Sequence, residues 1–134
     1  MTRGHWLKAL GSAESPLPDA WLEDGGAARR LGRTGFPRRP RMEAGDRLVY
    51  YASVWRRVFA LVEVVEEPTD AESMSARWPW TVEVEPLLVI PRLANAPPVE
   101  AIGVAARSMS QQSHIRLSEE HYARAVEAIA GVAA

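Results

Sequence analysis

Few side chains in this sequence could do acid–base or metal chemistry. The three histidines are His5, His114 and His121, and none of them stands in a metal-ligand spacing such as His-x-x-x-His. His5 and His114 are the only candidate general bases. A serine hydrolase would carry its nucleophile in a Gly-x-Ser-x-Gly turn, which the sequence lacks. The absence of cysteine excludes disulfides, a thiol nucleophile and cysteine-based zinc sites. We therefore expect a protein that is not an enzyme and that uses neither a metal nor a cofactor.

The tryptophans are a stronger indication of function. The sequence has five, and most of them stand near expected strand ends: Trp6, Trp21, Trp55, Trp78 and Trp80. Converging aromatic faces can stack on a flat nucleobase, which contributes about 1–3 kcal/mol per base. A methyl group on that base adds only about 0.8 kcal/mol, so only a tight pocket could detect it. The alternative is a place in the core, which we expect for Trp21 and Trp80. Trp55 is expected to be exposed on a hairpin, and Trp6 fits either place.

The arginines are unevenly distributed along the chain. The net charge is −1, yet nine arginines fall between Arg29 and Arg57, and seven acidic residues fall between Glu63 and Glu85. Arginine suits planar, bidentate contacts with phosphate. The candidates for contacts with a nucleic-acid backbone are Arg29, Arg30, Arg33, Arg38, Arg39 and Arg41. An arginine-rich, lysine-poor composition is also typical of proteins from GC-rich genomes, so the count alone does not decide the function.

The first half of the chain should place these residues on strands and one long loop. Residues His5 to Leu10 are expected to form a strand, and Ala20 to Glu23 a short helix that ends at Gly25 and Gly26. Residues 27–41 show no periodicity and are expected to form a loop. The segments 48–52 and 58–66 are apolar at nearly every position, which indicates strands covered on both faces.

The second half adds one alternating strand and two helices. Residues Thr81 to Glu85 alternate, with the valines inward and the glutamates outward, and Pro86 permits a bend or an edge position. A helix is expected to begin at Pro97-Pro98 and a short strand at His114. Ser118 should cap a final helix that ends at Gly131.

These elements indicate a single α+β domain over residues 1–134, with a curled sheet. No apolar run approaches the ~20 residues that a membrane helix needs. The N-terminus also lacks the apolar core of a signal peptide. We therefore expect a cytoplasmic protein.

The order of the motifs resembles the EVE domain of the PUA-like superfamily, which is related to the YTH domains. His5-Trp6-Leu7 is similar to the opening strand of that family, and Met42 to Ser53 to its Gly-Asp element and the strand ending in Tyr-x-Ser. Val58 to Asp70, Trp78 to Val84 and Ser110 to Tyr122 match later elements in order and spacing. The resemblance covers about four-fifths of the chain. It departs at residues 29–39, where many members carry a Trp-Gly-Val-Arg-Asn-like motif.

This resemblance implies a PUA-like pseudobarrel of mostly antiparallel strands with two or three flanking helices. It also implies a pocket at one end that holds a modified base. Carried over by position, the ligand-binding residues would be Trp6, Tyr51, Ala52, Ser53, Trp78 and His114, with Phe36 standing near the missing motif. The arginines between Arg29 and Arg41 would contact phosphates.

Three functions remain open at this point. The leading hypothesis is a non-enzymatic module that binds DNA or RNA and reads a modified, for example methylated, or flipped base. The second is a regulatory subunit that binds a small molecule or a protein, which the sequence pI of about 6.3 and the acidic segment support. The third is a metal-dependent hydrolase or nuclease that uses carboxylates such as Glu67 and Asp70.

Overall fold

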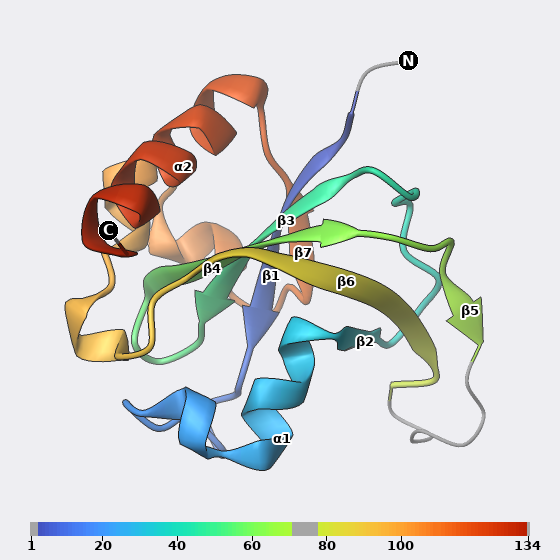
Figure 1. The fold of residues 1–134 in the computed structure, drawn as a ribbon, viewed down its shortest axis with the longest axis horizontal. Coiled ribbons are helices and arrows are strands. Elements are labelled where there is room, and N and C mark those ends of the chain that lie inside the picture. Colours follow the sequence, from blue (N-terminus) through green and yellow to red (C-terminus); the bar gives the residue numbers. More distant parts are fainter. Residues whose placement is uncertain (1–2, 71–77, 134) are drawn as a thin grey trace.

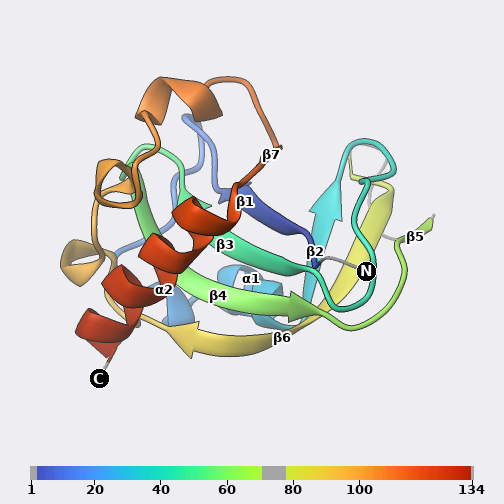
Figure 2. The same ribbon diagram turned by 90° about the horizontal axis from the view of Figure 1, so that it is seen from above.

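One strongly curved sheet organises this protein, whose computed structural model describes residues 3–70 and 78–133. In hydrogen-bonding order its strands are β2–β6–β4–β3–β1–β7, and β5 pairs with β6. Figure 1 shows the helical segments around the sheet, and Figure 2 shows the sheet curling into a half-barrel. The strands are β1 (His5–Leu10), β2 (Arg33–Phe36), β3 (Arg47–Ala52), β4 (Arg57–Val64), β5 (Thr69–Asp70), β6 (Trp80–Val89) and β7 (His114–Arg116).

Two α-helices and five 3₁₀ turns complete the described part of the chain. The α-helices are α1 (Gly25–Ala28) and α2 (Glu119–Ala133). The 3₁₀ turns are η1 (Trp21–Glu23), η2 (Arg29–Leu31), η3 (Leu93–Asn95), η4 (Val99–Ile102) and η5 (Ala106–Met109). This architecture confirms the predicted α+β class with a curled, mostly antiparallel sheet. Among the described strands only β1 and β3 run parallel to each other, with Leu7 opposite Val49.

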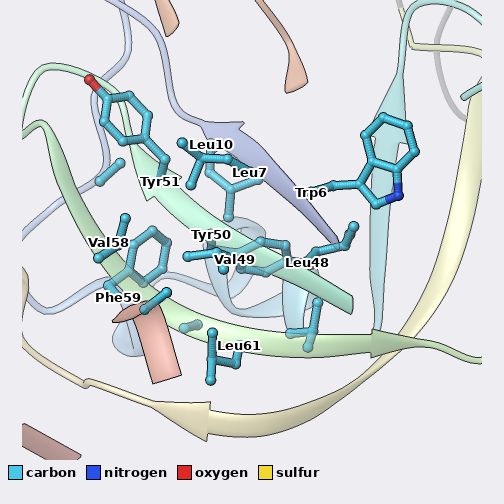
Figure 3. Close-up of a cluster of buried hydrophobic side chains, with 14 of the residues drawn as sticks. Trp6, Leu7, Leu10, Leu48, Val49, Tyr50, Tyr51, Val58, Phe59 and Leu61 are labelled. Atoms are coloured by element: carbon cyan, nitrogen blue, oxygen red, sulfur yellow. The ribbon is translucent and has the colours of Figure 1, made fainter. Parts of the chain in front are cut away.

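The strands β3 and β4 form the centre of the core, as their continuous apolar sequences predict. Figure 3 shows their side chains packed with Leu7 and Leu10 of β1. Trp21 closes one side of this cluster with its ring edge-on to Phe59 at a centroid distance of 4.8 Å, and its indole Nε1 donates to the Ile90 carbonyl. Trp21 is therefore a core residue, as expected.

A tight turn positions β3 against β1. Gly45 has a φ of +96°, which glycine adopts without the steric penalty of a side chain. The turn aims the buried Asp46 carboxylate back at the chain start. It accepts hydrogen bonds from the Gly4 amide at 2.8 Å, the Glu43 amide at 3.0 Å and the Trp6 indole Nε1 at 3.2 Å. The Gly-Asp turn thus holds the beginning of β1 in register with β3.

The strand β6 alternates as predicted, with Val82 and Val84 buried, and it continues through Pro86. Val62 pairs with Pro86 while Leu61 pairs with Leu88, so one residue of β6 is left over between them. This bulge places the proline where a ladder hydrogen bond is already interrupted.

Several helix boundaries and one loop were predicted wrongly. Gly25 and Gly26 begin α1 instead of ending a helix, because the Asp24 carboxylate accepts hydrogen bonds from the amides of Gly26 and Ala27. The expected loop over residues 27–41 contains η2 and β2. The segment after Pro98 forms two separate 3₁₀ turns, η4 and η5, with Gly103 at a φ of +86° between them.

The final helix begins as predicted but runs further. The Ser118 hydroxyl accepts a hydrogen bond from the His121 amide at 3.1 Å, which caps the first turn. Tyr122 and Ile129 are buried where α2 packs against η4, β4 and β6. Gly131 lies inside the last turn instead of ending the helix. No helix among the described residues is long and apolar enough to cross a membrane.

Candidate functional site

A cleft of about 1320 Å³ opens beside the ends of β1 and β3. Figure 2 places the segment after β1, the β3–β4 hairpin and the loop before β7 near one another at this end of the sheet. These segments supply residues 9 and 11–14, residues 51, 53, 54 and 56, and residues 106, 107 and 109–113. Pro37, Arg38 and Trp78 complete the lining from the region around β2 and β6.

The cleft wall combines aromatic surface with positive charge. Tyr51 and Trp78 contribute rings, and Arg38, Arg56 and Arg107 contribute guanidinium groups. Glu14 is the one acidic residue among the described lining residues. Burial raises the pKa of the Tyr51 hydroxyl, so this group remains a protonated hydrogen-bond donor at neutral pH. Such a surface suits a flat, polar, negatively charged ligand.

Strained backbone is concentrated along this cleft. Among the described residues, the non-glycine positions with a left-handed φ are Val54 at +75°, Arg56 at +57° and Gln111 at +59°, and all of them line it. A β-branched residue in this region is an outlier. Val54 also leaves 58% of its surface exposed. Strain of this kind persists where the surrounding structure imposes it, and it clusters at functional sites.

A second, smaller recess of about 260 Å³ adjoins the cleft. The two hollows share Ala9, Gly11, Ser12 and Trp78 as a common wall. The recess is further lined by Lys8, Leu10, Ser15, Arg30 and Gly35.

A cluster of rings surrounds Lys8 beside this recess. Its amine Nζ lies 4.9 Å from the ring centroid of Phe36 and 5.4 Å from that of Trp78, and donates a hydrogen bond to the Ala9 carbonyl at 2.9 Å. His114 packs edge-on to Phe36 at 5.0 Å and tilted against Trp6 at 5.6 Å. Burial, with the charge of Arg30 as the smaller cause, lowers the pKa of Lys8 to about 7. Burial and the nearby Lys8 charge lower the pKa of His114, so its imidazole is neutral at neutral pH.

Solved structures share this architecture over nearly the whole chain. A hypothetical protein from Leishmania major matches with a TM-score of 0.64 at 16% identity, over 97% of this chain and 96% of that protein. A ZmASCH variant from Zymomonas mobilis matches with a TM-score of 0.56 at 13% identity, over 93% and 98% of the two chains. Human THYN1, in complex with DNA containing 5-methylcytosine, matches with a TM-score of 0.54 at 13% identity, over 92% and 96%.

The chain has a PUA-like fold, which these solved structures share. No family model matches the sequence, and no curated protein matches it. The likeness therefore lies in the three-dimensional arrangement, at sequence identities that establish the fold alone.

Within this PUA-like fold, only part of the predicted ligand-binding set reaches the cleft. Tyr51, Ser53 and Trp78 line it, and so do residues 110–113, which directly precede the predicted His114. Ala52 is fully buried and lines neither hollow. Trp6 lines neither hollow either, since its indole Nε1 is held by Asp46, and Figure 3 shows it on the opposite side of the core cluster from Tyr51.

Phe36 and His114 stand beside Lys8 and line neither hollow. Phe36 is fully buried, and the His114 Nδ1 atom lies 2.7 Å from the Ser113 hydroxyl oxygen. The predicted pocket residues are thus divided between the cleft wall, the ring cluster around Lys8 and, for Ala52, the core, so no single cage contains them all.

The six predicted backbone-binding arginines are likewise separated. Arg38 lines the cleft and Arg30 lines the recess. Arg33 is bound to Glu83 at 3.1 Å across the β2–β6 pair, and Arg39 stacks on Trp80 with 5.2 Å between its guanidinium carbon and the ring centroid. Arg29 and Arg41 are exposed and line neither hollow. Arg77, which stands in the segment between Glu63 and Glu85, lies outside the described residues.

The remaining tryptophans are half-buried. Trp80 packs against the edge of the core and is less buried than expected. Trp55 was expected to be an exposed hairpin aromatic, but it packs against the core and its Nε1 donates to the Leu17 carbonyl at 2.8 Å.

Sequence reasoning missed Lys8, Val54, Arg56 and Arg107. The signal for Lys8 was available, because it is the only lysine in the chain and shares a strand face with Trp6. The other three stand in hairpin and loop segments that are far apart in the sequence. No local sequence pattern predicts that these segments lie close together in the fold. Among the described residues no group of three His, Cys, Asp or Glu side chains could hold a metal ion.

Proposed function

We propose that this protein binds nucleic acid and holds one base in the cleft, where a modified or flipped base is read. The observation that carries the proposal is the composition of the cleft wall, with two aromatic rings and three arginines against one glutamate among its described residues. Aromatic faces stack on a base without regard to sequence, and arginines neutralise the phosphates on either side of it. The THYN1 structure supports the proposal, because that protein has a similar fold and is bound to DNA containing 5-methylcytosine.

The proposed activity is binding without turnover. The nearest approach to a nucleophile–base pair at the cleft is Ser113 with His114, whose hydroxyl oxygen and Nδ1 atom lie 2.7 Å apart. A catalytic histidine is oriented by a further group, commonly a carboxylate. Among the described residues no carboxylate forms a hydrogen bond or ion pair with the His114 ring, which packs against Trp6 and Phe36.

Fluorescence anisotropy with short labelled oligonucleotides tests the proposal. Single strands and duplexes, DNA and RNA, are compared with and without 5-methylcytosine or N6-methyladenine at several salt concentrations. Contacts between Arg38, Arg56, Arg107 and three phosphates of a single strand give a slope of log K against log salt of about −2. Absence of binding at low salt would contradict the proposal and favour the regulatory subunit with a small-molecule or protein partner.

A matched pair of variants locates the binding site. Trp78→Leu removes a ring that lines both hollows, and Trp55→Leu removes a half-buried ring that lines neither. Stacking is worth about 1–3 kcal/mol per base, so Trp78→Leu should weaken binding about 5- to 150-fold while Trp55→Leu leaves it within about twofold. Equal effects of the two substitutions would show that the base does not lie in the cleft.

A further inference from the structure

The only lysine of this chain is buried in an unusual place. Lys8 stands in the middle of β1 with 3% of its surface exposed, and it is one of the residues that line the recess. Its one hydrogen bond among the described residues goes to the neighbouring Ala9 carbonyl. No carboxylate of the described residues pairs with it. A buried ammonium group with a single backbone partner has hydrogen-bonding capacity left unused, since it carries three donors.

The other polar groups of the recess are also suited to an anion. Arg30 brings a second positive charge, and Ser12 and Ser15 bring hydroxyl groups. No acidic residue is among the described residues that line it. The neutral His114 and the rings of Phe36 and Trp78 stand on the other sides of Lys8. The Arg30 charge disfavours the protonated form of Lys8, and an anion in this hollow would stabilise both positive charges together.

Backbone geometry keeps the recess open at its junction with the cleft. Gly11, which both hollows share, has a φ of +78°, where a side chain would be strained. A Cβ atom added at Gly35 would lie 3.2 Å from the Cβ atom of Trp78, so a side chain there would press against the tryptophan of the common wall. A ligand that spans the junction would therefore meet a ring on one side and the two cations on the other.

We propose that the recess is a phosphate-binding subsite, in which Lys8 and Arg30 hold a phosphate group whose nucleoside lies in the adjoining cleft. The volume of about 260 Å³ is small beside the 1320 Å³ of the cleft, which fits a compact charged group next to a larger planar one. Arginine and lysine are the usual phosphate ligands, as a fork and as a point charge. The assignment of the nucleoside rests on the proposed function, whereas the anion site itself does not.

Nuclear magnetic resonance on the full chain tests the anion site directly. Inorganic phosphate is titrated into protein labelled with ¹⁵N while the Lys8 Nζ signal and the amides of Gly11, Ser12 and Gly35 are followed. Saturable shifts confined to these groups support the proposal, and their absence overturns it. This measurement needs no substitution, so it stays decisive even where a variant fails to fold.

Lys8→Met provides the matched test, because methionine keeps the apolar stem and removes the charge. Arg124→Met is the control: it also removes one positive charge, but from α2, which lines neither hollow. A charge-assisted hydrogen bond contributes about 1.5–3 kcal/mol, so phosphate affinity should fall about 10- to 150-fold in Lys8→Met and stay within about twofold in Arg124→Met. Unchanged phosphate affinity in Lys8→Met overturns the subsite.

Oligonucleotides distinguish a terminal phosphate from an internal phosphodiester. Strands with a 5′-phosphate and strands with a 5′-hydroxyl are compared on the wild type and on Lys8→Met. A preference for the 5′-phosphate that Lys8→Met abolishes supports a terminal monoester, and equal binding that Lys8→Met weakens supports a diester. Tight oligonucleotide binding that Lys8→Met leaves intact overturns the subsite but not the proposed function. Phosphate binding without oligonucleotide binding would support the subsite and contradict the proposed function.

Discussion

Replacing Lys8 by methionine should stabilise this protein at neutral pH and remove part of the pH dependence of its stability. Lys8 is 3% exposed, and burial lowers its pKa from 10.5 to about 7 in the folded protein. Folding therefore disfavours the protonated amine. Methionine fills a similar volume without a charge, so the variant avoids this cost and retains most of the packing around Phe36 and Trp78.

The size and sign of the effect follow from proton linkage. Each unit of pKa difference corresponds to about 1.4 kcal/mol, so the fall from 10.5 to about 7 makes the protonated amine costly by about 5 kcal/mol. Below about pH 7 both the folded and the unfolded chain carry the proton, and the whole cost is present. Between about 7 and 10.5 only the unfolded chain carries it, so wild-type stability relative to the variant rises with pH by about 1.4 kcal/mol per unit.

Urea denaturation followed by tryptophan fluorescence measures this difference directly. The free energy of unfolding is determined for the wild type and for Lys8→Met from about pH 6 to about pH 10. Arg124→Met serves as the control, because this arginine is exposed and pairs with Glu120 on the same helix. The difference between wild type and Lys8→Met should shrink with rising pH while the control stays constant. A pH-independent difference, or one that grows with pH, would refute the reasoning. Added phosphate should flatten the wild-type curve if the recess binds it.

Three further substitutions have expected results that urea denaturation can measure. Asp46→Ala removes an acceptor from three donors, those of Gly4, Trp6 and Glu43, and should destabilise the protein by about 3–6 kcal/mol, whereas Asp46→Asn should cost less. Val54→Gly relieves about 1–2 kcal/mol of left-handed strain against about 0.5–1 kcal/mol of added chain entropy, so stability should rise by up to about 1.5 kcal/mol while ligand binding weakens. Ser118→Ala removes the cap of α2 and should cost about 1 kcal/mol.

Each of these has a contradicting outcome. Equal losses for alanine and asparagine at position 46 would mean that the hydrogen bonds are not what the carboxylate contributes. Destabilisation by Val54→Gly would show that its side chain is held by packing, despite an exposure of 58%. Replacement of the exposed Ser108 by alanine is the control for Ser118→Ala and should change stability by less than about 0.5 kcal/mol.

The apolar pattern of the sequence predicted most of the sheet. Continuous burial of β3 and β4 and the alternation of β6 follow from side-chain periodicity, because a strand exposes alternate residues to opposite faces. The cap at Ser118 and the Gly-Asp turn before β3 are local motifs, and both are present. The short helices were harder to predict. Gly25 and Gly26 resemble the end of a helix. They begin α1 instead, because the amides of Gly26 and Ala27 donate hydrogen bonds to the Asp24 carboxylate.

The candidate site was predicted only in part, because its lining comes from segments far apart in the chain. Tyr51 and Ser53 were found through the strand end that carries them, and Trp78 through its place before β6. Trp6 was placed in the pocket by its position in β1, but the Asp46 carboxylate holds its indole away from the cleft.

The sequence by itself determined the α+β class, the central strands and the exclusion of cysteine chemistry, because these depend on composition and on patterns within a few residues. The tertiary structure decided which charges face the hollows. It bound Arg33 to Glu83, stacked Arg39 on Trp80, and buried Lys8 among aromatic rings beside Arg30. The curvature of the sheet determines which charged side chains face the cleft. It brings the ends of β1 and β3, the β3–β4 hairpin and the loop before β7 around one cleft. No local pattern specifies that closure.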